Sequence, residues 1–354
     1  MNNERPTPLI DDLEGTRSKL QHWFNARLGT PVTVSELTIP EATGMSNVTL
    51  LFDIRYEQGG RPVQQGCVGR LQPEIARPLF PEYDLALQYR VMDILGRRTE
   101  VRAPPLLGLE EDPSVLGTPF YIMARIDGRV PGDMPPYTMG GWLMEDTRPD
   151  QRKRIWEAGV CEIAKIHRLD YRALGFDFLA HPADGATALQ QQLRYWENYL
   201  SWGMEGQANP ICAGALAWLR GNQPRQEPTT LCWGDARIGN MMFGPDGQVS
   251  AVLDWEMVTL GNPLQDIMWW WYMDRFFSAG IGLPRLEGLP DRAATLALWE
   301  AESGFSSDDA HYYEVFAGLR YGLIMSRIMV GSGQTDQVAS NFALSLLETV
   351  LSEG

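Results

Sequence analysis

Residues 231–256 read LCWGDARIGNMMFGPDGQVSAVLDWE, and this stretch is the most informative part of the chain. Its centre, Gly-Pro-Asp-Gly at 244–247, is a turn-forming sequence between two short β-rich runs. Pro presets its own backbone angle and Gly tolerates a positive φ, so the pattern predicts a β-hairpin. Asp235 and Asn240 precede the first strand, and Asp254 ends the second. The hairpin therefore brings two carboxylates and one amide to the same end.

These three side chains suit phosphoryl transfer. Asp235 can accept a hydrogen bond from an attacking hydroxyl, while Asn240 and Asp254 offer the hard oxygen ligands that Mg²⁺ prefers. The Asp-x4-Asn spacing is weak by itself, because a chain of this length contains about one by chance. The hairpin and a strand-terminal Asp 14 residues after Asn240 make the combination specific. The alternative is that the three residues only shape turns and cap elements.

Outward from the hairpin, the apolar periodicity changes once along the chain. Before residue 128 short β-rich runs dominate, with helices predicted over 10–28 and 83–95. The predicted strands are 32–39, 47–56, 63–71, 106–109 and 120–126. Later helices are predicted over 150–169, 187–202, 210–220, 263–278, 308–329 and 337–351. The predicted class is therefore α+β, with a β-rich N-terminal lobe at 1–127 and a helical C-terminal lobe at 128–354.

Composition disfavours several classes of protein. The chain has 354 residues, 45 of them acidic and 30 basic, and a formal net charge of −15. A nucleic acid or an anionic membrane requires a basic face on its partner, so neither is expected. The first residues lack the pattern of a signal peptide, and the densest apolar run, 267–273, is too short to cross a bilayer. Four scattered cysteines without a C-x-x-C pair favour a reducing, cytoplasmic location, and no oligomeric state is indicated.

The motifs together resemble one known family. Trp-Gly-Asp235-x4-Asn240, then Val-Leu-Asp254-Trp-Glu and Leu-Gly-Asn-Pro-x-x-Asp266, are similar to the aminoglycoside phosphotransferases, relatives of the protein kinases. Thr-Gly-Met-Ser-Asn-Val-Thr at 43–49 resembles that family's phosphate-covering turn. The likeness extends over most of the chain, in particular to the bacterial branch related to kinase-like domains fused to acyl-CoA dehydrogenases.

The resemblance implies a protein-kinase-like bilobal fold that binds ATP or GTP between its lobes, with Mg²⁺ as the metal. Asp235 takes the catalytic position, and Asn240 and Asp254 take the metal positions. Asp266 takes the position of a buried aspartate that holds the catalytic loop in place, which we call the brace. The positions expected to bind the nucleotide are Gly44, Ser46, Asn47, Arg70, Ala124 and Ile126.

Three positions depart from the family pattern. Trp233 stands two residues before Asp235, where the family usually has His. Arg70 takes the place of the phosphate-binding Lys, and a guanidinium can bind phosphate through two N–H groups. Gln88 stands where the Glu partner of that cation is expected, and a neutral amide pairs with it more weakly.

The expected function is a Mg²⁺-dependent small-molecule kinase that moves the γ-phosphoryl group of ATP or GTP to a hydroxyl. The sequence does not identify the acceptor: an aminoglycoside, a hydrophobic alcohol and an acyl compound are all compatible with it, and a dedicated role in antibiotic resistance is not favoured. The alternative is a nucleotide-binding pseudokinase that serves as a sensor or interaction module. His167 is expected to be a packed core imidazole, and Trp269–Trp271 are expected to line a substrate pocket or to fill the core.

Overall fold

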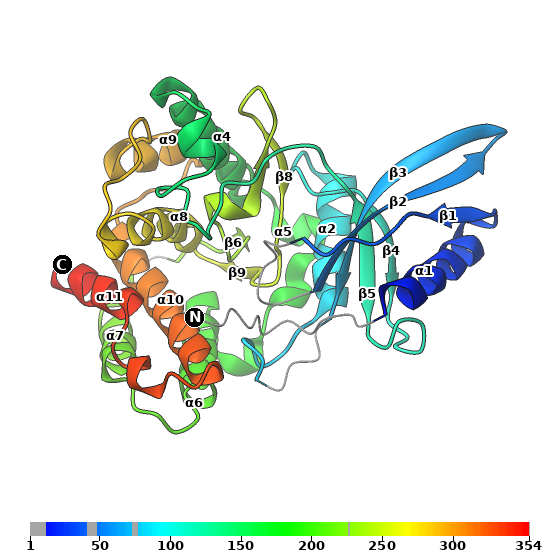
Figure 1. The fold of residues 1–354 in the computed structure, drawn as a ribbon. Coiled ribbons are helices and arrows are strands. Elements are labelled where there is room, and N and C mark those ends of the chain that lie inside the picture. Colours follow the sequence, from blue (N-terminus) through cyan, green and yellow to red (C-terminus); the bar gives the residue numbers. More distant parts are fainter. Residues whose placement is uncertain (1–11, 41–47, 73–76, 226, 354) are drawn as a thin grey trace. The chain divides into compact units, whose positions relative to one another are not determined.

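The computed structural model describes residues 12–40, 48–72, 77–225 and 227–353 (Figure 1). The chain folds as two compact units. Unit 1 comprises Met1–Arg97 and Ala103–Asp127, and unit 2 comprises Arg98–Arg102 and Gly128–Gly354. The main division therefore falls between Asp127 and Gly128, and a short segment from the N-terminal half groups with unit 2.

Unit 1 is built on a five-stranded antiparallel sheet. The strand order is β1 (Val32–Val34), β2 (Val48–Gln58), β3 (Arg61–Leu71), β5 (Phe120–Ala124) and β4 (Leu106–Glu110). Two helices, α1 (Leu13–Leu28) and α2 (Leu85–Arg98), belong to the same half of the chain. Strands β2 and β3 form the long blue hairpin in Figure 1, and Gly59 and Gly60 turn it with φ of 59° and 73°. Positive φ at both positions suits a two-residue hairpin turn, which glycine adopts without steric cost.

The core of unit 1 lies between the sheet and α1. Alternate residues of β2, such as Leu50 and Phe52, are buried with Leu20 and Phe24 of α1. The helix begins where Asp12 Oδ1 accepts a hydrogen bond from the N–H of Gly15 at 2.7 Å. The period-2 pattern of the strand and the apolar stripe of the helix thus meet in one cluster.

Unit 2 is mainly helical. Its helices are α3 (Trp142–Glu145), α4 (Pro149–His167), α5 (Tyr171–Leu174), α6 (Ala188–Gly203), α7 (Pro210–Gly221), α8 (Leu264–Phe276), α9 (Arg292–Ser303), α10 (Ala310–Gly331) and α11 (Phe342–Ser352). Helix α10 packs against α6, α7, α8 and α11 and is buried along most of its length. A helix that is apolar on nearly all sides belongs in the centre of a domain.

Two small antiparallel sheets interrupt the helices of unit 2. One pairs β6 (Thr230–Cys232) with β9 (Thr259–Gly261), and the other pairs β7 (Met241–Phe243) with β8 (Val249–Val252). The second sheet is the hairpin that the turn at 244–247 predicts. Between the two pairings, the chain passes from β6 through a loop to the hairpin and returns to β9.

The predicted α+β class with a kinase-like, bilobal organisation is confirmed, with local differences. The run 32–39 forms β1 and, after an interruption at Ser35, a single bridge between Thr38 and Leu51. At the interruption the Ser35 hydroxyl accepts a hydrogen bond from the Asp53 N–H at 2.9 Å. Helix α9 was not predicted, although Asp291 caps its first turn by accepting from the N–H of Ala294 at 2.8 Å. Strand β9 was also not predicted, and β5 ends two residues before Ile126. In the part of the chain that the structure describes, no helix meets the length and apolarity of a membrane span.

The alternation along β2 predicts how two neighbouring leucines differ. Leu50 is fully buried, whereas Leu51 is half-buried on the opposite face. We expect Leu50→Ala to lower the free energy of unfolding by about 2–5 kcal/mol, since it leaves a cavity in the core. Leu51→Ala should cost less than half as much. Urea unfolding of the two variants measures this difference, and equal losses would contradict the assignment of the two faces.

Candidate active site

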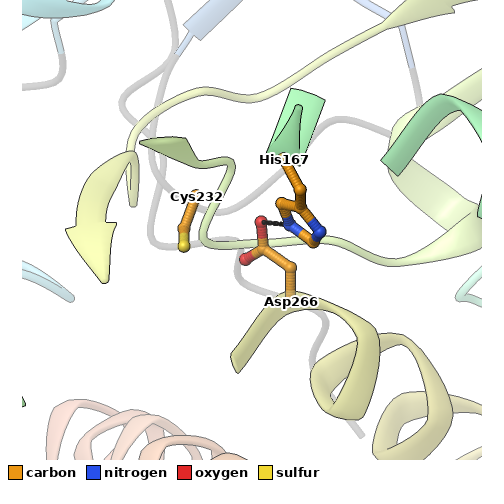
Figure 2. Close-up of side chains that lie close together, drawn as sticks. All are labelled: His167, Cys232 and Asp266. Carbon is orange, nitrogen blue, oxygen red and sulfur yellow. Dashed lines mark hydrogen bonds and ion pairs between the residues drawn. The ribbon is translucent and has the colours of Figure 1, made fainter. Parts of the chain in front are cut away.

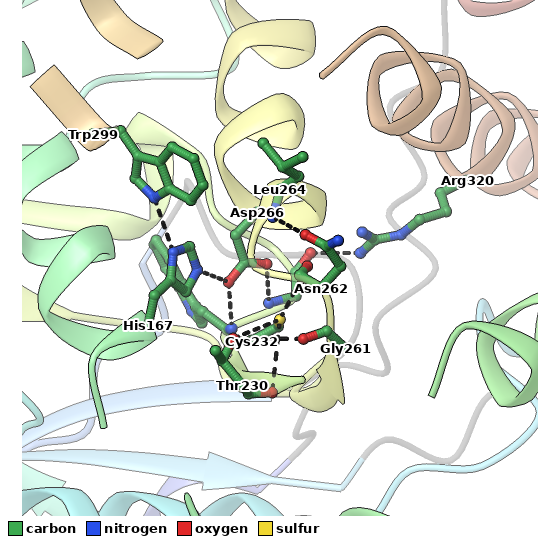
Figure 3. A network of polar contacts seen from close by, with 11 residues as sticks. His167, Thr230, Cys232, Gly261, Asn262, Leu264, Asp266, Trp299 and Arg320 are labelled. Carbon is green, nitrogen blue, oxygen red and sulfur yellow. Dashed lines mark hydrogen bonds and ion pairs between the residues drawn. The ribbon is translucent and has the colours of Figure 1, made fainter. Parts of the chain in front are cut away.

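Asp266 holds the loop that follows β6. It lies in the first turn of α8 and is fully buried, and its carboxylate accepts hydrogen bonds from two backbone N–H groups. These are the N–H of Trp233, at 2.6 Å from Oδ2, and the N–H of Gly234, at 2.9 Å from Oδ1. A buried carboxylate is costly unless such donors surround it. The pairing therefore sets the path of the loop, and Figure 3 shows Asp266 within the surrounding network of polar contacts.

His167, the last residue of α4, completes the environment of this carboxylate (Figure 3). The indole N–H of Trp299 donates to His167 Nδ1 at 3.0 Å, so Nδ1 is the nitrogen without a hydrogen. His167 Nε2 therefore carries the hydrogen and donates to Asp266 Oδ2 at 3.2 Å. The prediction of a packed core imidazole is confirmed, and this histidine contributes a fixed hydrogen bond.

His167 and Asp266 form a cluster with Cys232 whose possible ligand atoms lie within 4.8 Å of one another (Figure 2). Its polar atoms already make hydrogen bonds within the protein. Burial, and then the nearby charge of Asp266, raise the pKa of Cys232 well above its usual value, so the group is a thiol rather than a thiolate. Both other members already make hydrogen bonds. We therefore interpret the cluster as part of the brace behind the loop.

The conformation of Gly234 and a hydrogen bond from Arg320 also hold the loop. The φ of Gly234 is +94°, and a Cβ built there would lie 1.9 Å from the Met257 carbonyl oxygen, so only glycine fits. The buried guanidinium of Arg320, on α10, donates to the Gly234 carbonyl oxygen and lies 4.4 Å from the centre of the Trp269 ring. Burial lowers the pKa of Arg320, and the charges of Asp266 and Asp235 act in the opposite direction.

The next residue of the loop, Asp235, receives three hydrogen bonds. Its Oδ1 accepts from the indole N–H of Trp269 at 2.8 Å. Its Oδ2 accepts from Asn240 Nδ2 at 2.7 Å and from Arg237 Nε at 3.0 Å. Arg237 also pairs with Asp133. Burial opposes the charge of Arg237, yet the two carboxylates keep its pKa above the usual value.

Asn240 and Asp254 lie at the same end of the hairpin. Because Asn240 Nδ2 donates to Asp235, its Oδ1 is the atom that can coordinate a cation. The Leu253 N–H donates to the Asn240 carbonyl oxygen at 2.8 Å. This bond brings the backbone of Asp254, the next residue, close to that of Asn240. Asp254 has a φ of +57°, a left-handed conformation that is uncommon for residues other than glycine. The indole N–H of Trp233 lies 2.9 Å from the Leu253 carbonyl oxygen and 3.0 Å from that of Asp254, and it steadies this backbone.

The hairpin thus provides two carboxylates and an amide in one unit, as the sequence predicts. Asp235 is positioned to accept a hydrogen from a hydroxyl, and the oxygens of Asn240 and Asp254 suit a hard divalent cation. Sequence reasoning missed the roles of three residues that touch Asp235 or its loop: Arg237, Trp269 and Arg320. Arg237 lies inside the motif and carries a local signal, whereas Arg320 is distant in sequence and carries none.

The residues predicted to bind the nucleotide lie in unit 1. Gly44, Ser46 and Asn47 fall outside the described residues. Ala124 ends β5, and its N–H donates to the Pro105 carbonyl at 2.7 Å, while Ile126 lies two residues beyond the strand.

Arg70 and Gln88 do not pair in the way that the resemblance implies. Arg70, on β3, donates to Thr49 Oγ1 at 2.9 Å. Gln88 is buried in α2, and its Oε1 accepts no hydrogen bond from any described residue. The weak pairing expected between the Arg70 guanidinium and the Gln88 amide oxygen is therefore absent among the described residues.

Three comparisons place the chain among known proteins. The model of the phosphotransferase enzyme family matches residues 75–300. Acyl-CoA dehydrogenase family member 10 of Mus musculus is 29% identical over 97% of this chain and 31% of its own length, so this chain spans less than a third of that relative.

Solved structures agree with the family match. A Ralstonia eutropha protein named as an aminoglycoside phosphotransferase is 25% identical, with a TM-score of 0.68, over 95% of this chain and 98% of that one. A thermostable mutant of an aminoglycoside phosphotransferase, solved with ADP and hygromycin B, shares the fold at 17% identity. Its TM-score is 0.53, and the match covers 95% of this chain and 99% of that one.

Replacing Asp266 by Asn tests the brace. The amide nitrogen would face a backbone N–H and leave that donor without an acceptor. We expect Asp266→Asn to lower the free energy of unfolding by about 1–3 kcal/mol. Asp336→Asn, at an exposed turn, is the control and should change stability by less than about 0.5 kcal/mol. Urea unfolding measures both, and wild-type stability in Asp266→Asn would show that the carboxylate is dispensable.

Proposed function

The chain belongs to the phosphotransferase enzyme family, and we propose that it moves the γ-phosphoryl group of ATP or GTP to a hydroxyl group of a small molecule. The observation that carries this proposal is the hydrogen bond from Asn240 Nδ2 to Asp235 Oδ2. It orients the amide so that its oxygen is available to a cation beside the carboxylate of Asp254. It also fixes the carboxylate that would receive the acceptor hydroxyl.

Each of the three hairpin residues takes one role in this proposal. Asp235 orients the acceptor hydroxyl and takes up its hydrogen as the oxygen bonds to the γ-phosphorus and the bond to the leaving nucleoside diphosphate breaks. Asn240 and Asp254 would hold Mg²⁺, which when bound offsets the negative charge of the phosphates. Without such a cation, the carboxylates and phosphates would repel each other.

We propose that unit 1 supplies the nucleotide-binding residues. Arg70 carries a positive charge and N–H groups that can donate to phosphate oxygens, and its hydrogen bond to Thr49 restricts its rotation. The other proposed positions are Gly44, Ser46, Asn47, Ala124 and Ile126.

Two classes of acceptor deserve a direct comparison. The structural neighbours include a complex with hygromycin B, which favours an aminoglycoside. The mouse relative is an acyl-CoA dehydrogenase family member by name, which favours a hydroxyl-bearing acyl compound. Both classes carry the hydroxyl that the carboxylate of Asp235 requires.

A nucleotide-binding pseudokinase is the second candidate function. It is favoured by Gln88, a neutral residue where the resemblance implies an acidic partner for the phosphate-binding cation. The amide oxygen of Gln88 accepts no hydrogen bond from any described residue. A pseudokinase would bind nucleotide without transferring phosphate to any acceptor or to water.

Nucleotide binding is tested by thermal unfolding with ADP and ATP, with and without Mg²⁺. Ligand at 100 times its dissociation constant adds about 2.7 kcal/mol of stability, so we expect a rise of a few degrees that requires Mg²⁺. Asp254→Ala should abolish the Mg²⁺-dependent part. Asp246→Ala, which removes an exposed carboxylate from the turn of the same hairpin, should retain it. No rise with millimolar nucleotide in wild type would overturn the nucleotide site.

Phosphoryl transfer is tested with Asp235→Asn. The amide cannot take up a hydrogen, so we expect turnover to fall by about 100-fold or more. The Mg²⁺-dependent thermal shift should remain, because the ligands of the cation are intact. Phosphate release from ATP and transfer to an aminoglycoside and to a hydroxyacyl compound are the measurements. Wild-type protein that shows the shift but no turnover in any assay would be a pseudokinase.

A further inference from the structure

The hydrogen bonds of Asp235 leave one of its oxygens less occupied than the other. Oδ2 accepts from both Arg237 and Asn240, whereas Oδ1 accepts from Trp269 alone among the described residues. An ionised carboxylate has about two acceptor positions on each oxygen. The position that a substrate hydroxyl can use is therefore the second one on Oδ1, next to the Trp269 N–H.

Trp269 is rigidly placed for this contact. It lies three residues after Asp266 on α8, so the two side chains share one face of the helix. One face of its ring carries the Arg320 guanidinium at 4.4 Å, and Tyr321 packs edge-on with ring centres 6.0 Å apart. The side chain is almost fully buried. An indole packed between these neighbours has little freedom to change the direction of its N–H.

The neighbouring tryptophan shows that this contact is specific to one position. Trp270 is as deeply buried as Trp269, and it packs edge-on against Trp156 with ring centres 4.8 Å apart. Its indole N–H has no hydrogen-bond partner among the described residues. A tryptophan can therefore pack in this helix without a hydrogen bond from its indole N–H. At residue 269 the donor is aimed at the carboxylate of Asp235.

We propose that Trp269 is a positioning residue for phosphoryl transfer, and that it fixes Oδ1 of Asp235 as the oxygen that receives the hydrogen of the acceptor. This inference rests on the proposed function. The acceptor oxygen bonds to the γ-phosphorus of the nucleoside triphosphate, the bond to the β-phosphate oxygen breaks, and the nucleoside diphosphate leaves. The hydrogen of the acceptor passes to Oδ1 and is then released to solvent.

A neutral donor suits this task. The indole N–H does not ionise over the pH range in which proteins fold, so it donates at every pH. It also adds no charge beside the carboxylate of Asp235. Orientation and charge are thus assigned to different residues: Trp269 orients Oδ1, and Arg237 balances the charge on the side of Oδ2.

The experiment compares Trp269→Phe with Trp270→Phe, using MgATP with water as the acceptor and phosphate release as the assay. Both changes remove one indole from α8, and only the first removes a donor to Asp235. We expect Trp269→Phe to lower kcat by about tenfold to hundredfold, the effect of losing one hydrogen bond to a charged group, with KM for MgATP within about twofold. Trp270→Phe should retain kcat within about twofold. Thermal unfolding of both variants reports any general loss of packing.

A second variant removes only the donor. Incorporation of 3-benzothienylalanine at residue 269 keeps the shape of the ring and replaces the N–H by sulfur, so the fold should be retained. The inference requires the same fall in kcat without a fall in melting temperature. Wild-type kcat in this variant, or equal losses in the two Phe variants, would overturn the inference alone. Wild-type protein that binds MgATP and releases no phosphate to water or to any acceptor would overturn the proposed function and this inference with it.

Discussion

The candidate site depends on the hydrogen bonds that the buried carboxylate of Asp266 accepts. A charge without contact with water must be met by donors, and breaking such an arrangement costs far more than an exposed ion pair contributes. Two of the donors are backbone N–H groups of the loop after β6, so the loop cannot move without leaving the charge uncompensated. The third donor is His167, whose own orientation is set by Trp299. The rigidity of Asp235 follows from this arrangement.

Trp233 connects the loop that carries Asp235 to the strand end that carries Asp254. Its backbone N–H belongs to the brace of Asp266, while its indole N–H reaches the carbonyl oxygens of Leu253 and Asp254. The second contact steadies a residue in a left-handed conformation, which needs support from its surroundings. Trp233, where the resemblance implies His, therefore supplies a hydrogen-bond donor at this point. It argues for an intact site, whereas the amide oxygen of Gln88, which accepts no hydrogen bond from any described residue, remains the feature that favours a pseudokinase.

Local patterns predicted the elements that short-range chemistry controls. The turn at 244–247 specified the hairpin, and apolar periodicity indicated the long helices of unit 2. Helix α9 was missed although Asp291 provides a capping signal, and the predicted strand 32–39 is interrupted at Ser35, whose hydroxyl accepts from the Asp53 N–H. The weak pairing expected between Arg70 and Gln88 is absent among the described residues, and Arg70 donates to Thr49 on the adjacent strand. Such competition between partners depends on distances that a sequence pattern does not contain.

The sequence by itself determined the class of fold, the hairpin and the identity of the three residues at its end, because turn chemistry and residue spacing act over a few neighbours. Only the tertiary structure decided which atoms of those residues are available. The orientation of the Asn240 amide is set by Asp235, and the occupancy of each oxygen of Asp235 is set by Arg237 and Trp269. Arg320 reaches the same loop from α10, 86 residues away in the chain. Hydrogen-bond capacity is shared among groups that only folding brings together, so its distribution has no signature in the linear pattern.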